Sequence, residues 1–108
     1  MNNQLDRCFD ALSHPVRRTI VERLANRPAT VGDAARGLGI SKPAVTKHVR
    51  VLEHAGLVRR RVEGRTHRLE LEAAPLGDVS RWLEFHRRLW EAKFDAVEEH
   101  LSDERRGE

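Results

Sequence analysis

Cysteine is nearly absent from this chain of 108 residues, in which Cys8 is the only thiol. One cysteine cannot form a disulfide within the chain, and it cannot supply the ligands of a zinc finger. A redox role for Cys8 would need a second thiol, which only another chain could supply. We therefore expect Cys8 to act as a small buried apolar residue of the first helix.

Long apolar runs are also missing, and none approaches the roughly 18 residues of a membrane span. Asp6 and Arg7 interrupt the N-terminus too early for a secretory signal. The sequence shows no glycine-rich phosphate loop, no Ser/His/Asp nucleophile arrangement and no paired-carboxylate pocket. These absences predict a cytoplasmic protein that is not an enzyme, with no membrane partner and no cofactor.

Charge is abundant but unevenly distributed. Residues 1–71 contain fourteen lysines and arginines against seven acidic residues, whereas residues 72–108 contain six against ten. Within the basic half, residues 41–68 hold eight basic and two acidic residues. This asymmetry is typical of a polyanion-binding half joined to a part with another task, although a basic surface alone is common and decides nothing.

The clearest pattern is a capped amphipathic helix in the middle of the chain. Ser41 can accept a hydrogen bond from the first turn, and Gly56 favours an end to the helix. Val45, Val49 and Leu52 recur at i, i+4 and i+7 and predict one apolar face. The opposite face is polar and mostly basic, with Lys42, Thr46, Lys47, Arg50 and Glu53.

Shorter helical patterns precede this helix. The spacing of apolar residues predicts a first helix over 5–12 and a second over 15–25. Thr30 can cap a short third helix, which a glycine-containing turn joins to the helix at 41–55. A short helix, such a turn and a longer capped helix are the parts of a helix-turn-helix, here at about 30–55. In that motif the second helix enters the major groove of DNA.

Two short runs, 57–62 and 66–71, flank a glycine-containing turn and predict a β-hairpin. A two-stranded ribbon beside a helix-turn-helix is a wing, here at about 57–71. Arg65 lies at its turn and is best placed to reach a phosphate or the minor groove. The hairpin is basic throughout, with Arg59, Arg60, Arg61, Arg65 and Arg68.

The remaining apolar surface lies on a long helix predicted over 75–101. Four of the five aromatic residues occur on it. Its apolar stripe is broader than the small domain formed by the preceding residues can cover. We expect this helix to pair with its twin and with the first helix in a homodimer; the alternative is that it folds back on its own domain. The expected interface residues are Leu5, Phe9, Leu83, Trp90, Phe94 and Val97.

The predicted fold class is mainly α with a small β-hairpin. It is a winged helix-turn-helix with N- and C-terminal dimerisation helices, formed as a single domain over residues 1–108. These elements resemble the ArsR/SmtB family of bacterial winged-helix repressors. The resemblance is carried by ALSHPVRRTI at 11–20, SKPAVTKHVRVL at 41–52 and AGLV at 55–58. It implies a homodimer joined through the first and last helices, a recognition helix at 41–55 and repression that an inducer relieves.

Many members of this family sense metals, but their ligand patterns are broken here. The arsenic and cadmium sensors carry Cys-x-Cys in the first helix of the motif, where this chain has no cysteine. In the last helix, Glu84 and His86 could imitate the first pair of the zinc-type site. Val97 then stands where a histidine is needed, and His100 stands in the glutamate position. We therefore predict no metal, and whether Glu84, His86 and His100 contribute to a non-standard site stays open.

The predicted partner is double-stranded DNA with an inverted-repeat operator, its half-sites about one helical turn apart. Lys47, Arg50, Arg65 and some of the other wing arginines would neutralise phosphates, while the helix N-terminal end would approach base edges. The inducer is unknown. Two other interpretations remain, namely a metal-responsive repressor and a protein-interaction module that uses the motif as a scaffold. The predicted DNA-binding residues are Ser41, Lys42, Pro43, Ala44, Thr46, Lys47, Arg50, Arg61 and Arg65.

Overall fold

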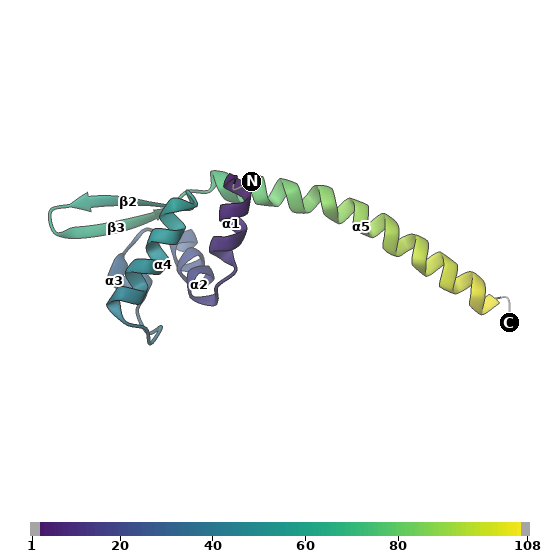
Figure 1. Cartoon of the computed structure of the whole chain (residues 1–108), viewed down its shortest axis with the longest axis horizontal. Coiled ribbons are helices and arrows are strands. Elements are labelled where there is room, and N and C mark those ends of the chain that lie inside the picture. The colour runs from purple at the N-terminus through teal and green to yellow at the C-terminus, as the bar shows by residue number, and fades with distance from the viewer. Residues whose placement is uncertain (1–2, 107–108) are drawn as a thin grey trace.

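A computed structural model describes residues 3–106, with side chains described up to residue 104. The basic half of the chain forms a head, and the last helix leaves this head as a rod (Figure 1). The elements in order are α1 (Gln4–Leu12), α2 (Pro15–Asn26), β1 (Ala29–Thr30), α3 (Val31–Ala34), α4 (Lys42–His54), β2 (Val58–Glu63), β3 (Thr66–Leu71) and α5 (Ala74–Arg106). The predicted winged helix-turn-helix arrangement is confirmed.

Side-chain caps begin the helices of the head. Ser41 accepts a hydrogen bond from the backbone N–H of Ala44 at 3.3 Å, and Thr30 accepts one from Asp33 at 3.2 Å, as the sequence predicts. The cap of α2 is less expected. The backbone N–H of Val16 in its first turn donates to the Nδ1 atom of His14 at 3.2 Å, so that a histidine serves as the cap.

The wing belongs to a three-stranded antiparallel sheet in the order β1-β3-β2. Glu63 pairs with Thr66 across a two-residue turn, where Gly64 has a φ of 63°, as the first central residue of a type II′ turn requires. The sequence did not predict β1. Its two residues pair with β3 through Ala29↔Leu69 and Thr30↔Arg68, and a strand of two residues has no periodicity to detect.

The core of the head joins α2, α4 and the sheet. Ile20, Val49, Leu52, Leu57 and Leu69 are each fully buried. The apolar face predicted for α4 is the face that enters this core, so its opposite face is left to solvent. Cys8 is also buried, as expected, and burial raises the pKa of its thiol.

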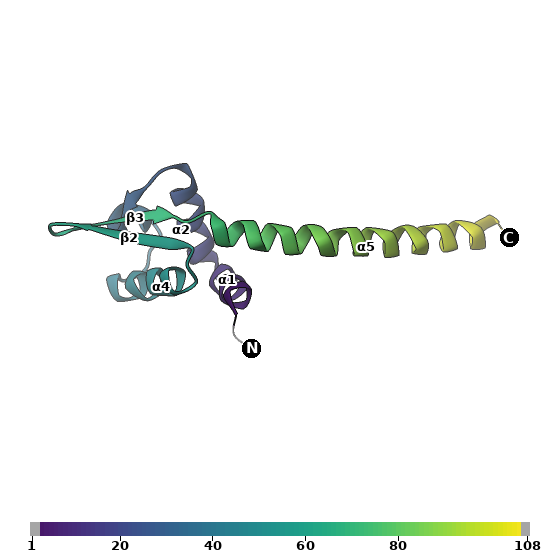
Figure 2. The same ribbon diagram turned by 90° about the horizontal axis from the view of Figure 1, so that it is seen from above.

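Among the described residues, helix α5 contacts the head only near its start. Val79 is buried there, and the ring of Trp82 meets Phe9 of α1 edge to face, with 5.4 Å between ring centres. Beyond this point both views show no other element beside the helix (Figures 1 and 2). It spans 33 residues and extends past the predicted end at residue 101. No helix within the described residues has the length and apolar character needed to cross a membrane.

Gly56, which follows α4, gives a test of this packing. Its φ is +76°, and a Cβ added there would lie 2.9 Å from Nε2 of Gln4, whose amide donates to the carbonyl of Ala55. We expect Gly56→Ala to lower the free energy of unfolding by about 1–2 kcal/mol, because a left-handed backbone disfavours a Cβ by that amount. Urea titration at a fixed protein concentration measures the change.

The matched control is Gly32→Ala. Gly32 lies in α3, has no positive φ, and an added Cβ would meet nothing within 4 Å. Alanine should leave stability unchanged or raise it there, because it is the better helix former. Equal losses in the two variants would refute the role assigned to Gly56.

Candidate nucleic-acid interface

The outer face of α4 is exposed from its first turn to Arg50. Lys42, Thr46, Lys47 and Arg50 are all exposed on it, while Val45 and the rest of the apolar stripe are buried beneath. The buried stripe fixes the rotation of α4 about its axis. The basic side chains on the opposite face therefore point into solvent. The structure thus presents this set of predicted residues together on one surface.

The first turn of α4 is equally accessible. Ser41, Lys42 and Pro43 are exposed, and Ala44 is half-buried. The helix N-terminus carries a partial positive charge, which adds to that of Lys42 and favours phosphate nearby. Four of the predicted DNA-binding residues therefore lie at an end of the helix that can enter a groove.

The two faces of the wing differ in what they present. Val58 and Arg60 lie on the side of β2 that faces α4, whereas Arg61 points to the other side and pairs with Glu70 at 3.4 Å. Arg65 is exposed at the turn. The predicted residues Arg61 and Arg65 are therefore not brought into contact with the basic face of α4.

Arg60 joins the wing to α4, and the sequence analysis did not single it out. Its guanidinium binds both carboxylate oxygens of Glu53, with 2.7 Å from Nη2 to Oε1 and 3.4 Å from Nε to Oε2. A third nitrogen lies 3.0 Å from Nδ1 of His67 on β3. The signal was available, because alternation along β2 puts Arg60 on the same face as the buried Val58.

A hollow of about 730 Å³ lies between α4 and the wing. Its lining combines the basic face of α4 with the Arg60–Glu53 pair: Thr46, Arg50, Glu53, His54 and Arg60. Glu53 is the only carboxylate in this lining, and Arg60 neutralises it. The hollow can therefore accept a phosphate-bearing chain without repelling it.

His48 holds α4 against the start of α2. Its ring lies 4.4 Å from that of His14, and its Nδ1 atom lies 3.4 Å from a guanidinium nitrogen of Arg17. Burial lowers the pKa of His48, and the nearby His14, Arg17 and Lys47 lower it further. The lowered pKa favours the neutral ring, and His48 serves as a packing residue between α4 and the start of α2.

A second exposed surface follows α5. Of the predicted interface residues, Leu83, Trp90, Phe94 and Val97 are about half exposed or more, with Phe94 at 62%. Phe9 is partly exposed beside Trp82, whereas Leu5 packs against the core of its own chain. Within the described residues, no other element covers the α5 side chains Leu83, Trp90, Phe94 and Val97.

The candidate metal ligands do not form a cluster in the described part of the chain. His100 pairs with Glu104 at 2.9 Å, and His86 stacks on Trp82 with 4.0 Å between ring centres. Glu84 binds Arg87 and Arg88 instead, and the hydrogen bond from Arg87 is the main cause of its lowered pKa. Among residues 3–106, no three His, Cys, Asp or Glu side chains are close enough together to hold a metal ion.

Comparison with known proteins agrees with this geometry. Residues 12–61 match a family model described as a helix-turn-helix domain. The chain is 45% identical to the HTH-type transcriptional regulator Rv2034 of Mycobacterium tuberculosis over 66% of either chain. It is 32% identical to the transcriptional repressor SdpR of Bacillus subtilis, over 77% of this chain and 88% of that one. A crystal structure of an ArsR family transcriptional regulator superposes with a TM-score of 0.78 at 36% identity, covering 82% of this chain and 98% of the other.

Proposed function

This chain belongs to the ArsR family of helix-turn-helix transcriptional regulators, and from that premise we propose that it is a homodimeric repressor of an inverted-repeat operator. A regulator of this family binds DNA and is not an enzyme. We place its action in the bacterial cytoplasm, where the chromosome is accessible.

The observation that carries the proposal is the exposed basic face of α4 with the wing beside it. An α-helix fits the major groove, and the exposed Lys47 and Arg50 can neutralise phosphates on its rims. Ser41, Lys42 and Thr46 lie toward the N-terminal end of α4 and would contact base edges. Pro43 and Ala44 would meet a thymine methyl group, and Arg61 and Arg65 would contact the backbone through the wing.

The homodimer is supported by the apolar stripe of α5. Its large side chains are exposed along most of the helix, from Trp82 to Leu101. Arg87 lies at the edge of this stripe and binds Glu84 and Glu91, which lie one turn away in each direction on the polar side. A rod with one polar side and one apolar side is suited to pair with a second copy, and two copies would present two α4 helices to two half-sites.

Selection of bound duplexes from a random pool tests this function directly. We expect enrichment of an inverted repeat whose half-site centres lie about 10 base pairs, or a multiple of that, apart. Light scattering of the complex should give two chains per selected duplex. A duplex taken from the unselected pool is the control and should bind more weakly. A pool that enriches no repeat, or a complex with one chain per duplex, would contradict the proposal.

A further inference from the structure

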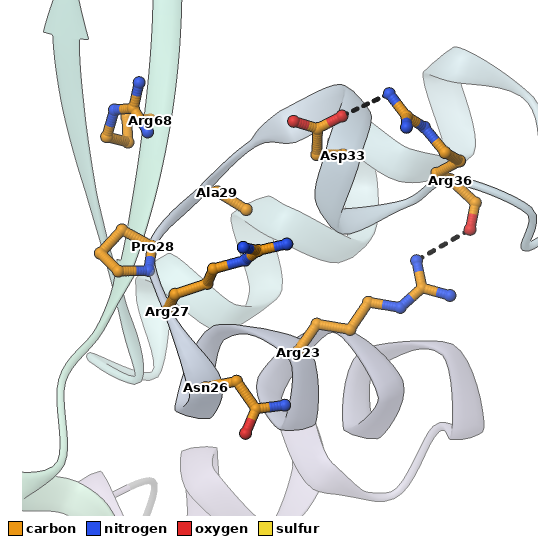
Figure 3. A pocket seen from close by; sticks show the side chains of 8 residues that line it. All are labelled: Arg23, Asn26, Arg27, Pro28, Ala29, Asp33, Arg36 and Arg68. Carbon is orange, nitrogen blue, oxygen red and sulfur yellow. Dashed lines mark hydrogen bonds and ion pairs between the residues drawn. The ribbon is translucent and has the colours of Figure 1, made fainter.

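A pocket of about 540 Å³ lies between the end of α2, β1, α3 and β3 (Figure 3). Four arginines from separate parts of the chain line it: Arg23, Arg27, Arg36 and Arg68. Asp33 is its only carboxylate, so the lining carries an excess of three positive charges. Gathering like charges in this way is unfavourable unless an anion offsets them.

Two of these arginines are already bound within the protein. Arg23 donates to the carbonyl oxygens of Ala34 at 3.0 Å and Arg36 at 2.8 Å, and so ties α2 to the turn after α3. Arg36 pairs with Asp33 at 2.6 Å. The side chains of Arg27 and Arg68 have no hydrogen-bond or ion-pair partner among the residues that the structure describes. Their donors are therefore free for a ligand.

The pocket is separate from the hollow between α4 and the wing. Helix α4 packs against β2, whereas α2 and α3 pack against β3 and β1 at the other edge of the sheet. Seen from above, the segment that carries β1 lies on the opposite side of the wing from α4 (Figure 2). None of the residues predicted to bind DNA lines the pocket.

We propose that this arginine pocket is a binding site for phosphate groups. Guanidinium groups bind phosphate through paired charge-assisted hydrogen bonds, and several of them around one pocket suit a ligand with more than one negative charge. The amide of Asn26 adds a neutral donor to the lining. The phosphate can come from a small free polyanion or from the DNA backbone, and the two sources are separable by experiment.

A ligand in this pocket bridges two parts of the DNA-binding head. Arg68 lies on the wing strand β3, while Arg27 directly follows α2. One anion bound by both would fix the wing relative to α2. A free polyanion bound there is consequently placed to change how the head meets DNA.

The test is titration of the full chain with inorganic pyrophosphate by isothermal calorimetry, at constant ionic strength and without DNA. Because no DNA is present, failure of this binding is distinct from failure of the proposed repressor function. We expect wild type to bind pyrophosphate and the variant Arg27→Gln/Arg68→Gln to bind about tenfold more weakly or worse, since charge-assisted hydrogen bonds are lost. The variant Asp33→Asn should bind more tightly, because it removes the one negative charge of the lining.

The matched control is Arg81→Gln/Arg88→Gln, which removes two charges from exposed positions on α5. It should bind pyrophosphate as wild type does, and thermal unfolding without ligand verifies that each variant is folded. A second arm measures the affinity of the same proteins for the selected operator. If only this affinity falls in the pocket variant, the site is supported with the DNA backbone as its source of phosphate. If the pocket variant equals the control in both arms, the proposal is wrong.

Discussion

Replacing Lys47 and Arg50 together by alanine is expected to weaken operator binding by about 2–4 kcal/mol, or roughly 30- to 1,000-fold. Both side chains are exposed on α4 and have no partner among the described residues, so their charges are available for phosphates. A dimer would lose four such contacts. The logarithm of affinity should therefore depend on the logarithm of salt concentration with a slope smaller by about 3–4.

Fluorescence anisotropy at several salt concentrations measures the affinity and the slope together. The control, Arg81→Ala/Arg88→Ala, makes the same change in net charge on α5. It should alter the salt slope far less, because those positions are remote from the α4 face. Thermal unfolding should be similar in both variants, since neither touches the core. An unchanged affinity after loss of Lys47 and Arg50 would show that this helix is not the one that enters the groove.

Local patterns explain why α4 was predictable from the sequence. Its expected span, 41–55, differs from the observed Lys42–His54 only at the ends. The cap at Ser41, the spacing of Val45 and Val49 and the positive φ of Gly56 all act within one or two turns. The family resemblance, which rests largely on these same residues, is confirmed by the comparisons.

Interactions between distant segments were not predictable in the same way. The ion pair between Arg60 and Glu53 forms because the wing packs against α4. Alternation along the strand predicts the face on which Arg60 lies, but not which residue it meets there. The arginine pocket joins Arg23 to Arg68, which no short window of sequence brings together. The apolar pattern ends at Leu101, which is why the predicted helix ended there. The helix itself continues because the polar residues that follow include no helix breaker before Gly107.

The second large effect is expected on the apolar stripe of α5. Replacing Trp90 and Phe94 by glutamate should convert the protein to a monomer, because each carboxylate would have to be buried against a second copy without a partner. Trp90 is 55% and Phe94 62% exposed, so the isolated chain loses little packing of its own and should still fold. Light scattering after size exclusion, over a range of protein concentrations, measures the oligomeric state.

The same double variant should bind the operator about 100-fold or more weakly, although its α4 face is intact. Two linked heads bind an inverted repeat with an affinity on the order of 10²–10⁴ times that of one head. Dissociation of the dimer removes this gain in affinity. The control is Ser80→Glu/Ser102→Glu, which adds the same two charges at exposed serines on α5 outside the apolar stripe. It should stay dimeric and retain most of its affinity for DNA. A dimeric Trp90/Phe94 variant would place the interface elsewhere, and a monomer with full affinity would show that pairing is not what the inverted repeat requires.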